Sequence, residues 1–158
     1  MRLARGLYRV ADAPLSDHES LAAVCKLVPD AVACLLSALQ FHAIGTQMPH
    51  QVWIGVDRKA RKPEVTGLAV RIVRFSGAMR RYGVESHELA GVPVRITSPA
   101  RTVADCFRFR SVVGLDVALE ALKDVIRGRR VRVDELERAA EVVGVAEQMS
   151  PYLEAVLA

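Results

Sequence analysis

Apolar and polar residues alternate in several short segments of the first hundred residues. The clearest case is 92–97, where Val92, Val94 and Ile96 alternate with Pro93 and Arg95. This period of two is typical of a strand with one buried face. The same pattern predicts further strands at 7–10, 51–56, 68–75 and 86–89, with a hairpin that turns at 90–91.

From Ser98 onward the apolar residues recur with the period of a helix. Ser98 followed by Pro99 is a helix start, because the hydroxyl accepts from a free backbone N–H and proline needs no donor at the first helical position. Apolar residues then fall on one face, while Arg101 and Asp105 fall on the other. The predicted helices are 16–28, a second around 35–42, 99–109, 115–127, 134–143 and roughly 150–157.

The order of these elements predicts the fold class. Strands gather in the first part of the chain and helices in the last, which favours an α+β fold. We expect a single mixed β-sheet backed by helices, with a helical C-terminal third. A length of 158 residues is typical of one domain, with or without a short arm.

Two helical segments carry a resemblance to a known family. The run SPARTVADCF at 98–107, followed by GLDVALEAL at 114–122, resembles the C-terminal domain of the AbiEi family. These proteins are abortive-infection antitoxins and transcriptional regulators of bacterial type IV toxin–antitoxin systems. Further matching segments follow the same order: GLYRV at 6–10, LLSALQFH at 35–42, HQVWIGV at 50–56, RIVRFSG at 71–77 and GVESHELAGVPV at 83–94.

The resemblance implies a function and a domain boundary. It implies a non-enzymatic antitoxin domain that opposes a nucleotidyltransferase-like toxin and takes part in repressing its own operon. Family members usually carry a winged helix-turn-helix before this region, and 6–10 resembles the last strand of its wing. Residues 1–12 are therefore expected to be a remnant of that wing or an N-terminal arm, and 13–158 the antitoxin domain.

Composition narrows the class of protein. About half of the residues, 51%, are apolar, enough for a substantial core. The cysteines Cys25, Cys34 and Cys106 form no C-x-x-C pair, which favours buried, reduced thiols. The longest apolar run is far too short to cross a membrane. We expect a soluble cytoplasmic protein with no membrane partner.

Positive charge is concentrated in two segments. The net charge is +4, yet residues 57–81 hold eight basic and two acidic side chains, and 95–132 hold nine and four. Residues 133–158 reverse this, with one arginine against six carboxylates. Such asymmetry indicates a surface for nucleic acid or an acidic partner, and a solvated face is the alternative. The binding candidates are Arg58, Lys59, Arg61, Lys62, Arg71, Arg74, Arg80, Arg81, Arg101, Arg129 and Arg130.

Arg101 and His42 could each serve in binding or catalysis, or instead stabilise the fold. Arg101, beside Ser98 at a helix start, is placed to bind a phosphate, or else forms an exposed i, i+4 pair with Asp105. The pattern favours the exposed pair. His42, on an apolar helix face, is predicted to be a hydrogen-bonded core residue rather than a catalytic base.

Catalytic motifs are sparse. The sequence has no phosphate-binding G-x-x-x-x-G-K-[ST] or G-x-G-x-x-G loop and no H-E-x-x-H pair, so we predict no cofactor and no metal. One alternative is a Mg²⁺-dependent nuclease of the PD-(D/E)xK type, with Asp30, Asp57 and Lys59 as its site. Asp30 falls at an element junction, not clearly beside the 51–56 strand. We therefore predict that the two carboxylates lie too far apart to share a metal, and that the chain is no enzyme.

Overall fold

The structure is a computed structural model that describes residues 2–4, 7–8 and 16–158. The predicted strand at 7–10 is confirmed at 7–8, while its other residues and the predicted boundary at 12–13 lie outside the described residues. The elements are β1 (Arg2–Ala4), β2 (Leu7–Tyr8), α1 (Asp17–Leu27), β3 (Val32–Ala33), α2 (Leu35–Phe41), β4 (Val52–Asp57), β5 (Val70–Phe75), the 3₁₀ turn η1 (Gly77–Arg80), β6 (Val84–Leu89), β7 (Val92–Thr97), α3 (Pro99–Arg108), α4 (Arg110–Val113), α5 (Leu115–Arg127), α6 (Val133–Val143) and α7 (Ala146–Leu157).

The central feature is a five-stranded mixed sheet in the order β5-β4-β3-β7-β6. β4 pairs with β5 and β3 with β7 in parallel, whereas β3 pairs with β4 and β6 with β7 antiparallel. β1 and β2 form a separate antiparallel pair. The prediction of an α+β fold, with one mixed sheet backed by helices and a helical C-terminal region, is confirmed.

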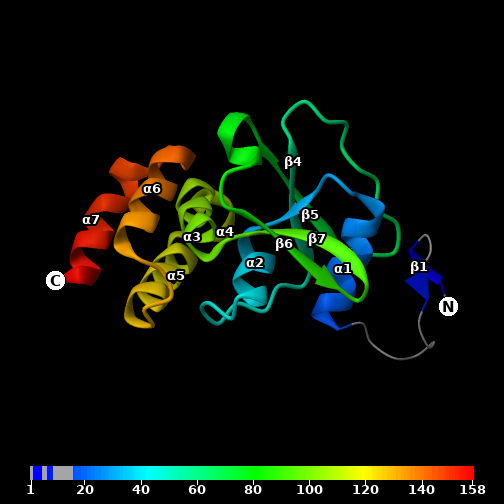
Figure 1. Cartoon of the computed structure of the whole chain (residues 1–158), viewed down its shortest axis with the longest axis horizontal. Helices are drawn as coiled ribbons and strands as arrows, with labels where there is room; N and C mark the ends of the chain where they lie inside the picture. Colours follow the sequence, from blue (N-terminus) through cyan, green and yellow to red (C-terminus); the bar gives the residue numbers. More distant parts are fainter. Residues whose placement is uncertain (1, 5–6, 9–15) are drawn as a thin grey trace.

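Helices cover the sheet on both sides. Ile54 and Ile96 belong to the core that the sheet forms with α1. Trp53 and Phe75 belong to a second core, which they share with α3, α5, α6 and α7. Figure 1 shows the strands and α1 toward one end of the molecule and the C-terminal helices at the other. β7 and α3 follow each other directly and connect the two parts.

Local signals explain most element ends. Ser98 accepts a hydrogen bond from the N–H of Arg101 and begins α3, as predicted. The β6–β7 hairpin turns at Ala90 and Gly91, whose φ angles of 50° and 75° fit the tight turn that suits twisted strands. Four short elements, β1, β3, η1 and α4, were not predicted. α7 begins earlier than predicted and continues through exposed Pro151, which supplies no N–H to the helix.

The three cysteines lie in the core, as predicted for buried thiols. Cys25, Cys34 and Cys106 are free and buried in the structure. Burial raises the pKa of the Cys25 thiol to about 11. A thiol in such surroundings is mostly protonated at neutral pH and is a poor nucleophile.

Candidate anion-binding site

Four of the predicted basic residues line one open pocket of about 500 Å³. Arg58 and Lys59 come from the loop after β4, whereas Arg80 and Arg81 come from the end of η1 and the residue after it. We call this site the basic pocket. Its lining is completed by Asp57, Ser76, Gly77 and Ala78.

The parallel pairing of β4 with β5 brings the two basic segments together. Asp57 at the end of β4 lies opposite Phe75 at the end of β5, and the N–H of Arg58 donates to the Phe75 carbonyl at 2.8 Å. The chain then turns, because Ala60 N–H donates to the Asp57 carbonyl at 2.9 Å and Lys59 N–H to its Oδ1 at 3.2 Å. Carboxyl ends of parallel strands meet at one edge, so the loops that follow them wall a crevice there.

The charge of the basic pocket is only partly compensated. Arg80 Nη1 lies 3.6 Å from Asp57 Oδ2, and the two side chains are 45% and 34% exposed. Among the residues that the structure describes, Arg58, Lys59 and Arg81 form no ion pair. Three positive charges therefore surround the pocket without an acidic partner, an arrangement suited to holding an anion.

Arg71 and Arg74 on β5, two further binding candidates, make contacts within the protein. Arg74 Nη1 donates to the carbonyls of Asp57, at 3.1 Å, and of Ala60, and so fastens the start of the loop. The Arg71 guanidinium lies 5.7 Å from the centre of the Trp53 ring, within cation–π range. Arg74 thus supports the loop beside the basic pocket, whereas Arg71 lies near the start of β5, and neither lines the pocket.

Arg101 is the candidate that the structure contradicts. Its side chain is fully buried, and Nε donates to Asp105 Oδ1 at 2.9 Å. Nη1 donates to the carbonyls of Met79 and Tyr82, both at 2.6 Å. The residues from Met79 to Tyr82 cover the polar face of α3, which the periodicity predicted to face solvent. The prediction of an exposed pair, and of Arg101 as a binding residue, is therefore wrong.

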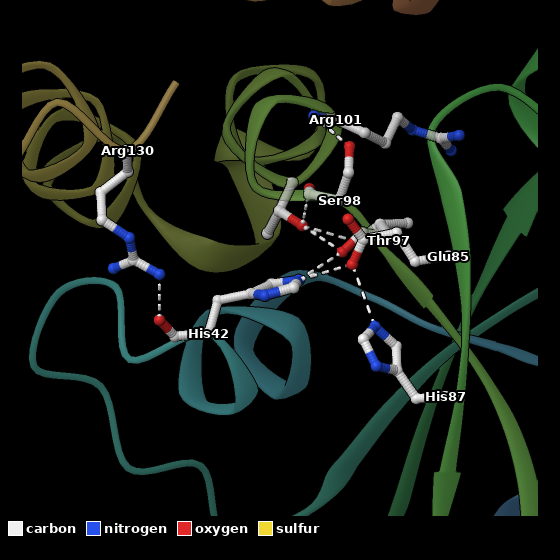
Figure 2. Close-up of polar contacts among 8 residues, drawn as sticks. His42, Glu85, His87, Thr97, Ser98, Arg101 and Arg130 are labelled. Carbon is white, nitrogen blue, oxygen red and sulfur yellow. Dashed lines mark hydrogen bonds and ion pairs between the residues drawn. The ribbon is translucent and has the colours of Figure 1, made fainter.

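Arg101 instead supports the basic pocket from below the surface. The two carbonyls that it bonds flank Arg80 and Arg81, so one guanidinium fixes the segment that carries both. The same guanidinium lies 4.8 Å from the centre of the Phe75 ring, at the end of β5. Figure 2 shows Arg101 beside Ser98, at the start of α3.

The buried pair of Arg101 and Asp105 leaves two of its polar atoms without hydrogen bonds to any described residue. Within the described part of the chain, Arg101 Nη2 and Asp105 Oδ2 have no hydrogen-bond partner. Burial raises the pKa of Asp105 to about 6, although the neighbouring Arg101 acts in the opposite direction. Desolvation of the carboxylate therefore outweighs its attraction to the guanidinium, as is common for buried ion pairs.

Arg129 and Arg130 lie at the opposite end of the sheet from the basic pocket. Arg130 donates from Nη2 to the His42 carbonyl at 2.5 Å (Figure 2) and from Nη1 to the Ala43 carbonyl at 3.3 Å. His42 in turn contacts Thr97 at the end of β7, and the strand pairings place that end beside the start of β4. The sheet thus separates these arginines from the basic pocket. Arg129 is exposed.

Arg61 and Lys62 belong to the same loop as Arg58 and Lys59. Both are exposed, as predicted for this polar loop, and neither lines the basic pocket. They extend the positive surface along the loop and away from the pocket.

His42 is hydrogen-bonded, as predicted. Its Nε2 lies 2.8 Å from the Thr97 carbonyl, which only accepts, so this nitrogen carries the hydrogen. Burial lowers the pKa of His42. Glu85 Oε1 lies 3.0 Å from His87 Nε2 and 3.9 Å from His42 Nε2 (Figure 2). The ring, whose side chain is only 9% exposed, joins the end of α2 to the sheet.

The nuclease candidates lie closer to each other than the sequence indicated. Val32 pairs with Gly55, so the register places Asp30 near Asp57, and both line a cavity of about 20 Å³. Asp30 therefore lies beside the end of this strand, which the sequence did not make clear. Two arginines share the cavity, whereas Lys59 lines the neighbouring basic pocket. That the carboxylates are too far apart to share a metal stays a prediction. No group of three or more His, Cys, Asp or Glu among the described residues could hold a metal ion.

A second pocket, of about 400 Å³, was not predicted. It lies between α1, α2 and the start of β4, and its polar lining includes Asp17, His18, Gln40 and His50. Gln40 Nε2 donates to Asp17 Oδ2 at 2.9 Å, and the His18 ring lies 5.6 Å from that of Phe41. These residues are far apart in sequence and form no motif, so only the fold reveals the pocket.

No family model and no curated protein matches this sequence. The resemblance to the AbiEi family therefore stays a prediction. In the described part of the chain, the helices are too short or too polar to span a bilayer.

Proposed function

We propose that the chain is a non-catalytic, cytoplasmic antitoxin domain of the AbiEi type. It opposes a nucleotidyltransferase-like toxin and contributes to the repression of its own operon. The proposal depends on an ordered resemblance that runs over nearly all of the chain, roughly from Gly6 to Leu153. The matching segments from 35 to 122 fold into one unit around the five-stranded sheet, which is the single structural observation that supports it most.

The most characteristic segment, 98–107, supports the proposal by its position. It forms α3, which packs against α2, α5 and α6. Its residues from Ala100 to Phe107 are all buried. A motif that builds the core of a domain is expected to recur with the fold, so its position supports the family resemblance without marking a binding site.

Co-expression with the neighbouring toxin-like gene tests this function. Induction of that gene alone is expected to stop growth, and the present chain is expected to restore it. The control is Val103→Asp, which buries a charge in the core and removes the folded domain while leaving the transcript nearly unchanged. Failure of the expressed, folded chain to restore growth would contradict the proposal.

A sequence-nonspecific nucleic-acid-binding module is the second candidate. It is favoured by the uncompensated charges of the basic pocket together with exposed Arg61 and Lys62. Binding would depend steeply on salt, since each neutralised phosphate releases counterions. Replacing Arg58, Lys59, Arg61 and Lys62 together by alanine should weaken binding uniformly across sequences. A sharp preference for one operator sequence would contradict this candidate.

A further inference from the structure

The basic pocket combines positive charge, unpaired among the described residues, with a concave surface. Arg58, Lys59 and Arg81 contribute three unpaired positive charges, and the charge of Asp57 is already balanced by Arg80. Like charges held around one pocket repel each other, and a multivalent anion between them removes that repulsion.

The dimensions of the pocket favour a small ligand. Its volume of about 500 Å³ lies within the range of small-molecule sites. The cations converge on it from two segments, the loop after β4 and the end of η1, instead of following one strand or helix as a track. No aromatic side chain lines it, so nothing in the lining would stack on a nucleobase.

We propose that the basic pocket binds the di- or triphosphate group of a small molecule, either inorganic pyrophosphate or the phosphate tail of a nucleotide. Arg58 and Arg81 supply planar guanidinium groups that match phosphate oxygens in pairs, and Lys59 supplies a compact charge. The Ser76 hydroxyl adds a donor on the η1 side. This binding goes beyond the antitoxin proposal and does not depend on it.

Asp57 gives the proposal a distinctive signature. Its carboxylate lies at the edge of the basic pocket and holds Arg80 at 3.6 Å. Asparagine has the same shape and can still accept from the Lys59 N–H, but it removes one negative charge. Asp57→Asn should therefore tighten anion binding, whereas removal of a basic side chain should weaken it.

Calorimetric titration of the full chain with pyrophosphate, ATP and sulfate tests the site. We expect saturable binding of pyrophosphate and ATP that weakens as salt is raised, with sulfate binding more weakly. Arg81→Gln and Lys59→Met should each weaken pyrophosphate binding about tenfold, the loss of one charge-assisted contact. Arg129→Gln removes the same charge from an exposed residue at the other end of the sheet and should change nothing.

The affinities for pyrophosphate and ATP distinguish the two possible sources of the phosphate group. Equal affinity for pyrophosphate and ATP would assign recognition to the phosphates alone, and tighter binding of ATP would add a contact to the nucleoside. No binding of either at millimolar concentration would overturn the proposal. Binding of oligonucleotides alone would also overturn it and would favour the nucleic-acid module. Growth rescue in the co-expression experiment is scored separately, so failure of one proposal leaves the other standing.

Discussion

The segment from Met79 to Tyr82 is held by the arginine of one arginine–aspartate pair and supplies the arginine of another, and the two pairs differ in burial. Arg101 and Asp105 are 2.9 Å apart and fully buried. Arg80 and Asp57 are 3.6 Å apart and partly exposed to solvent. The same two residue types thus provide an internal support in one place and the edge of the basic pocket in the other. Burial, not residue type, decides the role.

The largest expected effect on stability is that of replacing the buried arginine, Arg101, compared with the same change at the partly exposed Arg80. Arg101→Met leaves the Asp105 carboxylate and two backbone carbonyls without their donor. We expect a loss of about 3–5 kcal/mol in the free energy of unfolding. Arg80→Met, the matched exposed change, should cost about 0–1 kcal/mol. Urea unfolding of both variants measures the contrast, and similar costs would contradict it.

Two glycines extend the comparison to the backbone. Both Gly83 and Gly77 have positive φ, +64° and +56°, where a side chain is strained. An added Cβ at Gly83 would meet the Arg101 Cβ at 2.7 Å, whereas at Gly77 it meets nothing within 4 Å. Gly83→Ala should therefore cost about 2–4 kcal/mol, and Gly77→Ala about 1–2 kcal/mol. Thermal unfolding of both variants tests this. A larger loss of stability for Gly77→Ala than for Gly83→Ala would show that the contact between Gly83 and Arg101 is loosely packed.

The pH dependence of stability tests the buried carboxyl. The pKa of Asp105 rises from 3.8 to about 6 on folding, so the folded state holds this proton more tightly than the unfolded state. Its contribution is therefore present below about pH 4 and is lost as the pH rises through about 6. Asp105→Asn, an uncharged substitute, should remove this part of the slope and cost less than Arg101→Met at pH 7. An unchanged slope in Asp105→Asn would show that other groups cause it.

The smallest expected effect is on phosphodiester cleavage. Arg80 and Arg95 share the small cavity with Asp30 and Asp57, and two positive charges there disfavour a bound cation. We expect no cutting of DNA or RNA by the purified chain with Mg²⁺ or Mn²⁺. Cleavage that Asp57→Ala abolishes would overturn the non-enzymatic assignment.

The sequence predicted the parts of the fold that have strong periodicity. The β6–β7 hairpin, α3 and α5 follow from apolar spacing and from turn and cap residues. β3 has only two residues, too few for any period, yet it is the middle strand of the sheet. Its pairing with β4 places Asp30 near Asp57, which explains why their proximity could not be predicted.

The candidate site was predicted as residues but not as a pocket. Arg58 and Lys59 are more than twenty positions from Arg80 and Arg81, and only the parallel pairing of β4 with β5 joins them. Helical spacing also placed Arg101 on a polar face, because periodicity separates apolar from polar residues but does not show what packs over them. That cover comes from η1, an element without a sequence signal.

Growth of cells that carry the inducible toxin-like neighbour tests the central claim most directly. The wild-type chain and Arg80→Met, which keeps the buried support, should both restore growth. Arg101→Met should restore it less, in proportion to the folded protein that remains. Absence of rescue by soluble, folded wild-type chain would contradict the antitoxin assignment.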